Sequence, residues 1–347
     1  MSKDQTKKLF LCFCILIAAT FGFATIGAAA KINLKLGHET NINSACQVQA
    51  EIIKEMVEKR TNGEITVTIY PGGTLTGSPE ELLEFLRSGA VDISITATGN
   101  VSGFLDDLQF LNLPFLFKNF GHLNAGIESY PVRQILDKFE EKNGVKAIGL
   151  SEDGTGTCIT SINPIRSFKD MKNLKIRCMM NPIFIDMYKA FGCAPTPIDW
   201  SELYTSLKMG AVEAQDNAPF LSYTTKFFEV QNAVAVTKHY WSGFMMLISK
   251  SKFDKLTPEQ QQILIQTAKE TNILQIEYCH TMDKITLDKL AKQGKVVTYP
   301  DMKPFEKAMP VVYDKWFKKY PHWKAWYEEI QKINPETVSP KAGLPKM

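Results

Sequence analysis

Arg177 is the residue in this chain whose type and surroundings best support a chemical role. It ends the short apolar and basic run Asn173–Arg177, which predicts a β-strand, and a polar cluster follows later at Glu213–Pro219. A guanidinium at a strand end presents a planar fork of donors that matches a carboxylate bidentately. A surface ion pair is the ordinary alternative for such an arginine, so the elements around Arg177 must decide between the two.

The chain lacks the sequence motifs of the common enzyme classes. No G-x-S-x-G, G-x-G-x-x-G or P-loop motif occurs. The five histidines have no H-x-x-x-H spacing, so a metal site would need ligands from distant parts of the chain. Paired carboxylates such as Asp106 and Asp107 are typical of solvated surface runs. We therefore expect no catalytic residue, no metal ion and no cofactor.

The first thirty residues have the pattern of a secretory signal peptide. A basic start is followed by an apolar run from Leu9 to about Ile26 and by the small residues Gly27–Ala30. This pattern predicts cleavage after Ala30 and a mature protein in the periplasm. The alternative is that the apolar run is kept as a membrane anchor. No later run approaches the roughly 18 apolar residues of a transmembrane helix.

Removal of residues 1–30 would leave a nearly neutral chain. The full sequence has 40 Lys and Arg against 37 Asp and Glu, and the leader contains three lysines and one aspartate. This balance gives no electrostatic case for binding nucleic acid or an anionic membrane surface. The remaining length is sufficient for two domains.

The mature chain would keep an odd number of cysteines, none of them in a C-x-x-C motif. A single disulfide is one interpretation, but we favour buried thiols, because an odd number cannot all pair and the spacing indicates no framework. The cysteines concerned are Cys46, Cys158, Cys178, Cys193 and Cys279.

Alternating strand and helix signals predict an α/β chain. Strand patterns at Ile32–Leu36, Ile65–Tyr70 and Val91–Thr96 alternate with helical spacing at Cys46–Arg60 and with a helix that Ser78 opens. This alternation favours a first domain with buried, largely parallel strands. Further strands are predicted at Val145–Leu150, Cys158–Ile162, Leu174–Arg177, Phe244–Ser249 and Lys295–Tyr299. Further helices are predicted at Pro182–Phe191, at Ser201–Met209, from a capping box at Thr257–Gln260 to about Ala291, and in an aromatic-rich tail.

The stretch around Arg177 resembles the DctP family, the extracytoplasmic solute-binding proteins of TRAP transporters. That family has a K-[LIM]-R strand, a G-A-x-P-T-P turn, an [FW]-x-E-[VL]-Y helix start and a V-D-G-Q-E-N-P segment. The similar stretches here are Leu174–Arg177, Gly192–Pro197, Trp200–Tyr204 and Gly210–Asn217, with mild changes at Cys193, Glu213, Ala214 and Asp216. Weaker similarities occur at Tyr70–Pro71, Gly89–Asp92, Leu113–Phe117 and Phe228–Gln231.

The resemblance implies a two-lobed periplasmic-binding-protein fold of the type II-like kind. Mixed sheets, a ligand cleft between the lobes and a long helix near the C-terminal third belong to that fold. We expect lobe I at 31–154 plus 243–282, and lobe II at 155–242 plus 283–347 with a helical tail. The implied function is capture of a small organic acid and its delivery to a small and a large membrane permease subunit, without catalysis and by a monomer.

The resemblance also implies roles for particular residues. The arginine that matches Arg177 clamps the ligand carboxylate, the asparagine that matches Asn217 hydrogen-bonds it, and an aromatic residue at Trp200 lines the pocket. Many members have a second arginine where this chain has Thr157, which favours a monocarboxylate here. Glu39 falls at a pocket-edge position, where it would accept from ligand hydroxyls or an amine. The predicted ligand-binding set is completed by His38, Tyr240 and Trp241.

Several alternatives stay open at this point. Asn217 also suits a turn before Ala218 and Pro219, and Trp200 also suits an ordinary core. A sensory subunit that presents its ligand to a receptor kinase would have the same mature sequence, and only neighbouring genes for membrane subunits would decide for transport. A secreted enzyme on a similar two-lobed scaffold is a further alternative, for which the sequence offers no catalytic constellation.

Overall fold

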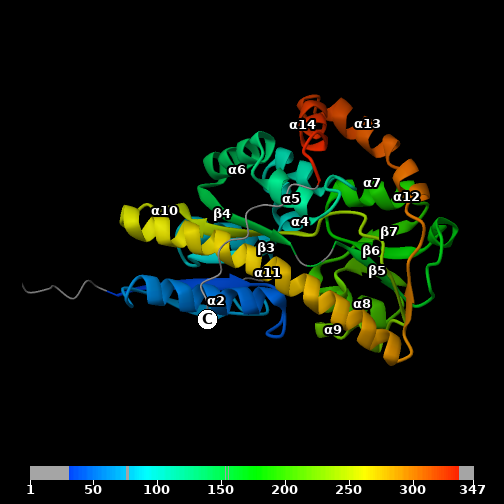
Figure 1. The fold of residues 1–347 in the computed structure, drawn as a ribbon, viewed down its shortest axis with the longest axis horizontal. Coiled ribbons are helices and arrows are strands. Elements are labelled where there is room, and N and C mark those ends of the chain that lie inside the picture. Colours follow the sequence, from blue (N-terminus) through cyan, green and yellow to red (C-terminus); the bar gives the residue numbers. More distant parts are fainter. Residues whose placement is uncertain (1–30, 76–77, 153, 155, 336–347) are drawn as a thin grey trace, which may run out of the picture. The chain divides into compact units, whose positions relative to one another are not determined.

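The computed structural model describes residues 31–335, except residues 76, 77, 153 and 155. The predicted signal peptide and its cleavage after Ala30 lie outside the described residues. Within them the chain forms two mixed β-sheets with helices around each (Figure 1). This architecture confirms the predicted fold class, and we call the part built on each sheet the first and the second lobe.

The first lobe is built on a sheet with the strand order β2-β1-β3-β10-β4. Strands β1 and β3 are parallel, but β10 is antiparallel to both β3 and β4. Strands β1 and β3 of the predicted alternation are thus parallel, as expected, and β4 runs in the same direction as β3. The sheet is mixed because β10 arrives from the second lobe and not through a helical crossover. The strands are β1 (Ile32–His38), β2 (Ile65–Tyr70), β3 (Ile93–Ala97), β4 (Val145–Glu152) and β10 (Gly243–Ser249).

Helices of several lengths surround the first sheet. Ser78 caps the start of α3 by accepting from the backbone N–H of Glu81, and Gly89 ends this helix in the left-handed conformation, as the sequence predicts. The elements are α2 (Ala45–Arg60), α3 (Pro79–Ser88), α4 (Thr98–Val101), η1 (Ser102–Phe104), η2 (Asp106–Asn112), α5 (Phe120–Ile127), α6 (Tyr130–Asn143) and α10 (Lys250–Phe253).

The second lobe is built on a sheet with the strand order β11-β9-β5-β8-β6-β7. Its strands are β5 (Cys158–Ser161), β6 (Lys175–Cys178), β7 (Ala194–Pro197), β8 (Ala214–Asn217), β9 (Ala233–Ala235) and β11 (Val296–Thr298). Strands β7, β8 and β9 are additional to those predicted from the sequence. The neighbouring helices are η3 (Phe168–Met171), α7 (Pro182–Ala190), α8 (Trp200–Lys208), α9 (Pro219–Thr224) and η4 (Phe227–Glu229).

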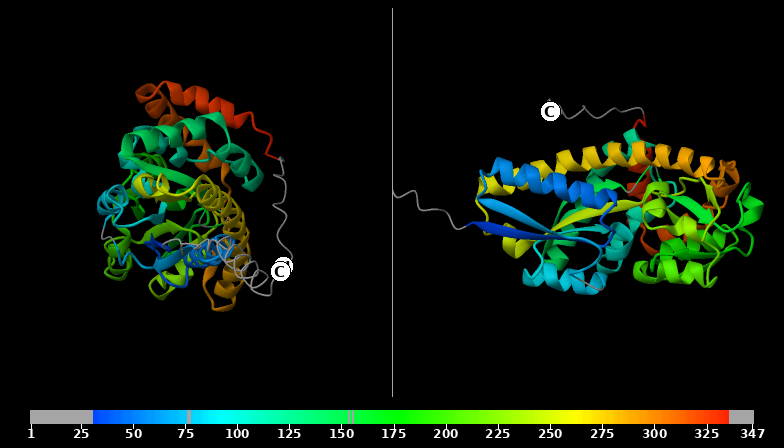
Figure 2. Two further views of the ribbon diagram at one scale, coloured as in Figure 1. Left: turned by 90° about the vertical axis from the view of Figure 1, so that its left-hand side faces the viewer. Right: turned by 90° about the horizontal axis from the view of Figure 1, so that it is seen from below.

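One long helix, α11 (Pro258–Lys292), belongs to both lobes. Thr257 and Gln260 form the predicted capping box at its start. Along its length α11 contacts α2 and β4 of the first lobe and then α9 and β11 of the second. The right-hand view of Figure 2 shows α2 and the first part of α11 lying side by side over the strands of the first sheet.

The chain also passes between the sheets in two further segments, which we call links. One link joins the end of β4 at Glu152 to the start of β5 at Cys158, and the other joins β9 at Ala235 to β10 at Gly243. The predicted lobe boundaries at 154/155 and 242/243 fall in these links, and the third, at 282/283, falls inside α11. These boundaries stay a prediction.

The C-terminal part of the described chain consists of α12 (Lys303–Lys307), α13 (Pro310–Lys319) and α14 (His322–Gln331). Asp107 in η2 anchors α14, because it accepts from His322 Nε2 at 2.6 Å and from Trp323 Nε1 at 2.9 Å, and it also pairs with Lys138 Nζ at 2.7 Å. The aromatic tail is therefore attached by directed polar contacts as well as by burial.

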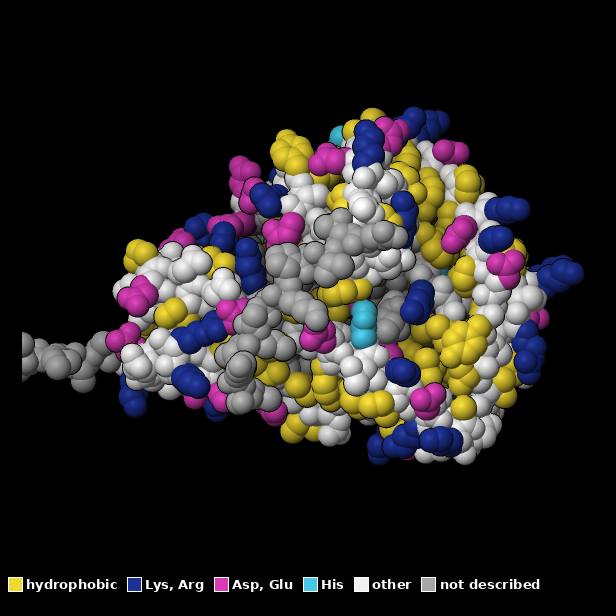
Figure 3. Space-filling model, viewed as in Figure 1, with side chains coloured by type: hydrophobic (Ala, Val, Ile, Leu, Met, Phe, Trp, Pro, Cys, Tyr) yellow, Lys and Arg dark blue, Asp and Glu magenta, His cyan; other side chains and the backbone are white. Residues whose placement is uncertain are grey.

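All five cysteines of the described chain are buried. Cys158, Cys178 and Cys193 are free thiols, and burial raises the pKa of each to about 12. On the face shown in Figure 3, basic and acidic side chains are interspersed, in keeping with their nearly equal numbers. Among the described residues, no helix is both long enough and apolar enough to span a membrane.

Candidate ligand-binding site

Two adjoining cavities lie between the lobes and share Glu39, Asn100 and Trp200 in their walls. The large cavity has a volume of about 420 Å³ and the small cavity about 30 Å³. The first volume is in the range of small-molecule sites, whereas the second holds no more than a group of the size of a water molecule or a carboxylate. The pair therefore fits a ligand with one small polar group and a larger body.

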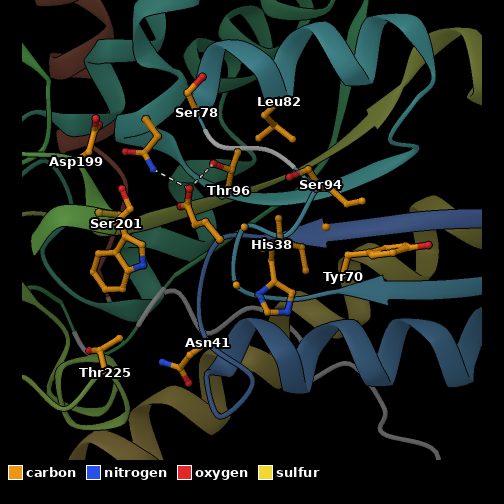
Figure 4. A pocket seen from close by; sticks show the side chains of 18 of the residues that line it. His38, Asn41, Tyr70, Ser78, Leu82, Ser94, Thr96, Asp199, Ser201 and Thr225 are labelled. Atoms are coloured by element: carbon orange, nitrogen blue, oxygen red, sulfur yellow. Dashed lines mark hydrogen bonds between the residues drawn. The ribbon is translucent and has the colours of Figure 1, made fainter. Parts of the chain in front are cut away.

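Polar side chains from both lobes line the large cavity. Figure 4 shows His38, Tyr70 and Thr96 from the first lobe, with Asp199, Ser201 and Thr225 of the second lobe on the opposite side. Apolar contacts come from residues such as Leu75, Leu82 and Phe227. A ligand body with several hydroxyl groups would find hydrogen-bond partners on both sides.

Arg177 lies in the wall of the small cavity. It is only 3% exposed, and its Nε donates to the carbonyl oxygen of Ile198 at 2.9 Å. That bond fixes the plane of the guanidinium without engaging its two Nη groups. The sequence-based alternative of a surface ion pair does not describe this buried position. A guanidinium with both Nη groups free can bind a carboxylate bidentately.

A buried carboxylate provides negative charge next to Arg177. Asp216 is 1% exposed and accepts a hydrogen bond from the Tyr188 hydroxyl. Burial raises the pKa of Asp216, while the charge of Arg177 and the Tyr188 hydroxyl oppose that rise. The hydroxyl of Tyr188 also lies 2.8 Å from Nε2 of His239, and burial lowers the pKa of this imidazole to about 3, so His239 is neutral at physiological pH.

Asn217 and Trp200 complete the side of the small cavity that belongs to the second lobe. Asn217 ends β8, and because successive side chains of a strand point to opposite faces, it faces the cavity while Asp216 faces the protein interior. Its Nδ2 donates to Oε1 of Gln215. Trp200 is the first residue of α8 and contacts Phe227 edge to face at 5.7 Å. Both side chains are half-buried.

Glu39 forms the opposite wall, directly after β1. Its carboxylate accepts from the backbone N–H of Ala97 at 3.1 Å, from Asn100 Nδ2 at 2.9 Å and from Thr96 Oγ1 at 3.4 Å. Burial raises the pKa of Glu39, whereas these donors and the charge of Arg177 oppose the rise. The structure thus brings four of the predicted residues together: Arg177, Asn217, Trp200 and Glu39.

His38 lines the large cavity only. Its Nδ1 lies 3.2 Å from Thr40 Oγ1 and its Nε2 lies 2.8 Å from Gln47 Oε1, so both ring nitrogens are engaged inside the first lobe. Burial lowers the pKa of His38, which favours the neutral imidazole.

Three other predicted residues are placed outside the walls of both cavities. The buried hydroxyl of Thr157 donates to the carbonyl oxygen of Tyr240 at 3.3 Å. The ring of Tyr240 lies 4.5 Å from that of Phe184, and Trp241 contacts Phe117 edge to face at 5.6 Å. Each of the three therefore supports the link between the lobes.

The sequence interpretation did not single out Asn41, Tyr70, Thr96 or Asn100 as site residues. Asn41 Nδ2 is buried and has no hydrogen-bond partner within the described part of the chain, so it is a donor available to a ligand. The parallel pairing of β1 with β3 sets His38 opposite Ile95, which brings the carboxyl ends of both strands to one edge. Ligands bind at such edges in open α/β sheets, and this rule would have pointed to Thr96 and Asn100.

The described residues, with the gaps given above, contain no group of three or more His, Cys, Asp or Glu side chains placed to hold a metal ion. What the arrangement offers chemically is an oriented guanidinium, an amide donor, one acceptor carboxylate and a polar cleft. This set of groups is chemically suited to an acid.

Comparison with known proteins identifies the family. The model of the bacterial extracellular solute-binding protein family 7, DctP, matches residues 36–320. The chain belongs to this family. The 2,3-diketo-L-gulonate-binding periplasmic protein YiaO of Escherichia coli K12 is 30% identical to this DctP-family chain over 298 residues, which are 86% of this chain and 90% of YiaO.

Solved structures of similar proteins show the same fold. A TRAP periplasmic solute binding protein from Pseudomonas putida F1 with bound D-glucuronate gives a TM-score of 0.82 at 26% identity, covering 88% of this chain and 99% of that one. Another, from Polaromonas sp. JS666 and bound to D-erythronate, gives a TM-score of 0.81 at 27% identity, with coverage of 88% and 99%. The DctP-family chain is thus a TRAP-type extracytoplasmic solute-binding protein, and its relatives are binding proteins, not enzymes.

Proposed function

We propose that this protein captures a sugar acid with one carboxylate and several hydroxyl groups, and delivers it to the membrane subunits of a TRAP transporter. The observation that carries this proposal is the junction of the two cavities. A chamber of about 30 Å³ beside a buried arginine opens into a polar cavity of about 420 Å³.

In this proposal the ligand carboxylate enters the small cavity. It receives the Nη donors of Arg177 and the amide of Asn217, while Trp200 covers one side of the adjoining carbon atoms. A carboxylate that leaves water must be paired and fully hydrogen-bonded, since its desolvation cost otherwise exceeds the gain from binding. The carbon chain extends into the large cavity, where Asn41 and Glu39 meet its hydroxyl groups and His38 forms part of the wall.

Thr157, Tyr240 and Trp241 act behind the cavity walls and not on the ligand. They connect the two links between the lobes, and closure of the lobes on the ligand is a hinge motion of the periplasmic-binding-protein kind. We infer that the protein works as a monomer in the periplasm after cleavage near Ala30.

The relatives support a sugar acid in particular. YiaO is named for 2,3-diketo-L-gulonate, and the two solved structures hold D-glucuronate and D-erythronate. Each of these ligands combines a single carboxylate with several oxygen-bearing carbons. The polar lining of the large cavity in this chain suits the same combination.

A thermal-shift screen followed by titration calorimetry tests the proposal. The panel contains D-glucuronate, D-gluconate, L-gulonate, D-galactonate and D-erythronate, with D-glucose and D-glucitol as uncharged controls of similar size. At least one acid should raise the Tm of the protein, because a ligand that binds only the native state stabilises it, and the uncharged compounds should not. A shift with sugars or amines, and none with acids, would contradict the role of Arg177.

Delivery to a permease is tested separately. The purified protein, loaded with the acid that binds it most tightly, should drive uptake of that acid into proteoliposomes that contain the small and large TRAP subunits. Binding without uptake, combined with activation of a receptor kinase, would favour the sensory role.

A further inference from the structure

A single carboxylate, Glu39, lies in the walls of both the small and the large cavity. It is therefore close to the ligand carboxylate on one side and to the ligand body on the other. Glu39 and Arg177 line the same chamber, and the positive charge of Arg177 acts on Glu39. Because of this position, the carboxylate of Glu39 acts on the ligand in both cavities, in addition to the guanidinium of Arg177.

Its hydrogen bonds hold Glu39 in place as an acceptor. Ala97 donates to Oε1, while Asn100 and Thr96 donate to Oε2. An ionised carboxylate has about four acceptor positions, so three donors leave about one for a ligand hydroxyl. Burial raises the pKa of Glu39, but all three contacts are with N–H or O–H groups, which favour the ionised form and oppose that rise.

Among the described residues that line the two cavities, Arg177 is the one lysine or arginine, so a second ligand carboxylate would find no cation there. Arg177 already has Asp216 beside it, in addition to Glu39. The neighbouring His38 is engaged by Thr40 and Gln47 and is favoured in its neutral form. The residues that line the large cavity include the carboxylic acids Glu39 and Asp199 and no lysine or arginine.

We propose that Glu39 restricts this site to acids with a single carboxylate, because it repels any second anionic group on the ligand body while it accepts from a hydroxyl. The inference rests on the proposed function and adds a selectivity mechanism to it. It differs from the explanation based on Thr157, whose buried hydroxyl is bonded to Tyr240 outside the cavity walls. Selection against dicarboxylates then comes from a charge that is present and not from an arginine that is missing.

The experiment compares matched acids that differ by one carboxylate. The pairs are D-gluconate with D-glucarate, D-galactonate with galactarate, and D-erythronate with meso-tartrate. Affinities are measured for the wild type, for Glu39→Gln, which removes the charge at nearly constant size, and for Glu55→Gln. Glu55 is an exposed residue of α2 outside the walls of both cavities, so it controls for the same change of net charge.

The wild type should bind the monocarboxylate of at least one pair and discriminate against its dicarboxylate partner. Repulsion between two unit charges near a protein surface corresponds to roughly 10- to 1,000-fold in affinity. Glu39→Gln should lower the discrimination ratio by about tenfold or more, while Glu55→Gln keeps the wild-type ratio. If Glu39→Gln is poorly folded by circular dichroism, Glu39→Ser, which also removes the charge, is measured in the same way.

Each outcome bears on a separate claim. An unchanged ratio in the Glu39 variants overturns the inference but leaves the proposed function standing, because the acid still binds. A wild type that prefers a dicarboxylate overturns the inference and, with it, the single carboxylate of the proposed ligand, while capture of a sugar acid by Arg177 still stands. Absence of binding by every acid of both panels contradicts the proposed function, and the inference fails with it.

Discussion

Replacement of Arg177 by lysine separates the charge of this residue from its geometry. A lysine keeps a cation beside Asp216 and Glu39, so the buried carboxylates retain their partner. It loses the Nε bond to Ile198 and the planar fork. By contrast, an uncharged residue would leave buried carboxylates without compensation, which typically costs about 3–5 kcal/mol of stability.

The two losses have different sizes. Loss of the bond to Ile198, at about 1 kcal/mol, should lower the Tm of the unliganded protein by no more than about 2–4 °C. A bidentate pair consists of two charge-assisted hydrogen bonds of roughly 1.5–3 kcal/mol each. Since lysine retains one of them, the Kd for the acid should rise by about 10- to 100-fold.

Calorimetric titration of Arg177→Lys with the tightest acid of the panel measures this effect, and Arg87→Lys is the matched control. Arg87 also donates from Nε to a backbone carbonyl, that of Asn143 at 2.8 Å, and from Nη2 to the Asn143 side chain at 2.9 Å, outside the walls of both cavities. The control should lose a similar amount of stability and no affinity. An Arg177→Lys protein that binds within about threefold of the wild type would refute bidentate recognition.

Three further predictions concern the site, the tail and the cysteines. Asn217→Asp should weaken binding of the acid by about 100-fold or more, because two carboxylates would then share one small cavity, and equal calorimetric affinity would contradict the placement of the carboxylate there. Burial tends to raise the pKa of Asp107, but the hydrogen bonds from Lys138, Trp323 and His322 outweigh burial and hold the pKa below its usual range. Asp107 therefore stabilises the folded protein above about pH 4, and this stability is lost as the pH falls through the lowered pKa. Asp107→Asn should therefore lower the Tm by about 3 °C or more at pH 7, with a difference that disappears on acidification, and a constant difference over the pH scan would speak against this account. The buried free thiols are Cys158, Cys178 and Cys193. After treatment with maleimide, mass spectrometry should find these thiols unlabelled in the native protein and fully labelled in the unfolded protein. Rapid labelling of the native protein would contradict their burial.

The long and regular elements of this fold were predictable from the sequence. Strand β2 has a clear alternating pattern, and α3 and α11 have explicit caps. The missed strands have no such signal. Strand β7 contains two prolines and forms an edge of its sheet, where proline is tolerated. Strand β8 buries polar residues that an amphipathic pattern would place in solvent.

The polar strand β8 shows why tertiary partners were needed to recognise it. Gln215 is fully buried because its Nε2 donates to Thr160 at 2.7 Å and to Ser222 at 3.1 Å. Asp216 is buried against Tyr188 and near Arg177. Except for Ser222, these partners lie far away in the sequence, so no local pattern indicates that such a segment forms a central strand.

The candidate site could be predicted only in part, because some of its residues belong to a local motif and others are defined by tertiary contacts. The motif around Arg177 carried Asn217 and Trp200 with it, and these lie together in the structure. Trp241 was assigned by its type and its place between the lobes, but Gly243 lets its indole lie against the backbone, where a Cβ would come within 2.4 Å of the ring. Asn41 was missed because its role depends on an unpartnered amide nitrogen, which only coordinates reveal within the described residues.

Helix α11 also limits how this sequence can change in length. Its 35 residues are fastened to α2 by Asn272, which accepts from Gln49 at 2.7 Å, and to α9 by Asp283, which accepts from the backbone N–H of Phe220 at 2.8 Å. Inserting one residue between these two anchors would turn the second half of the helix by about 100° and shift it by about 1.5 Å. Both attachments could not then form, so this stretch should accept substitutions far more readily than insertions or deletions.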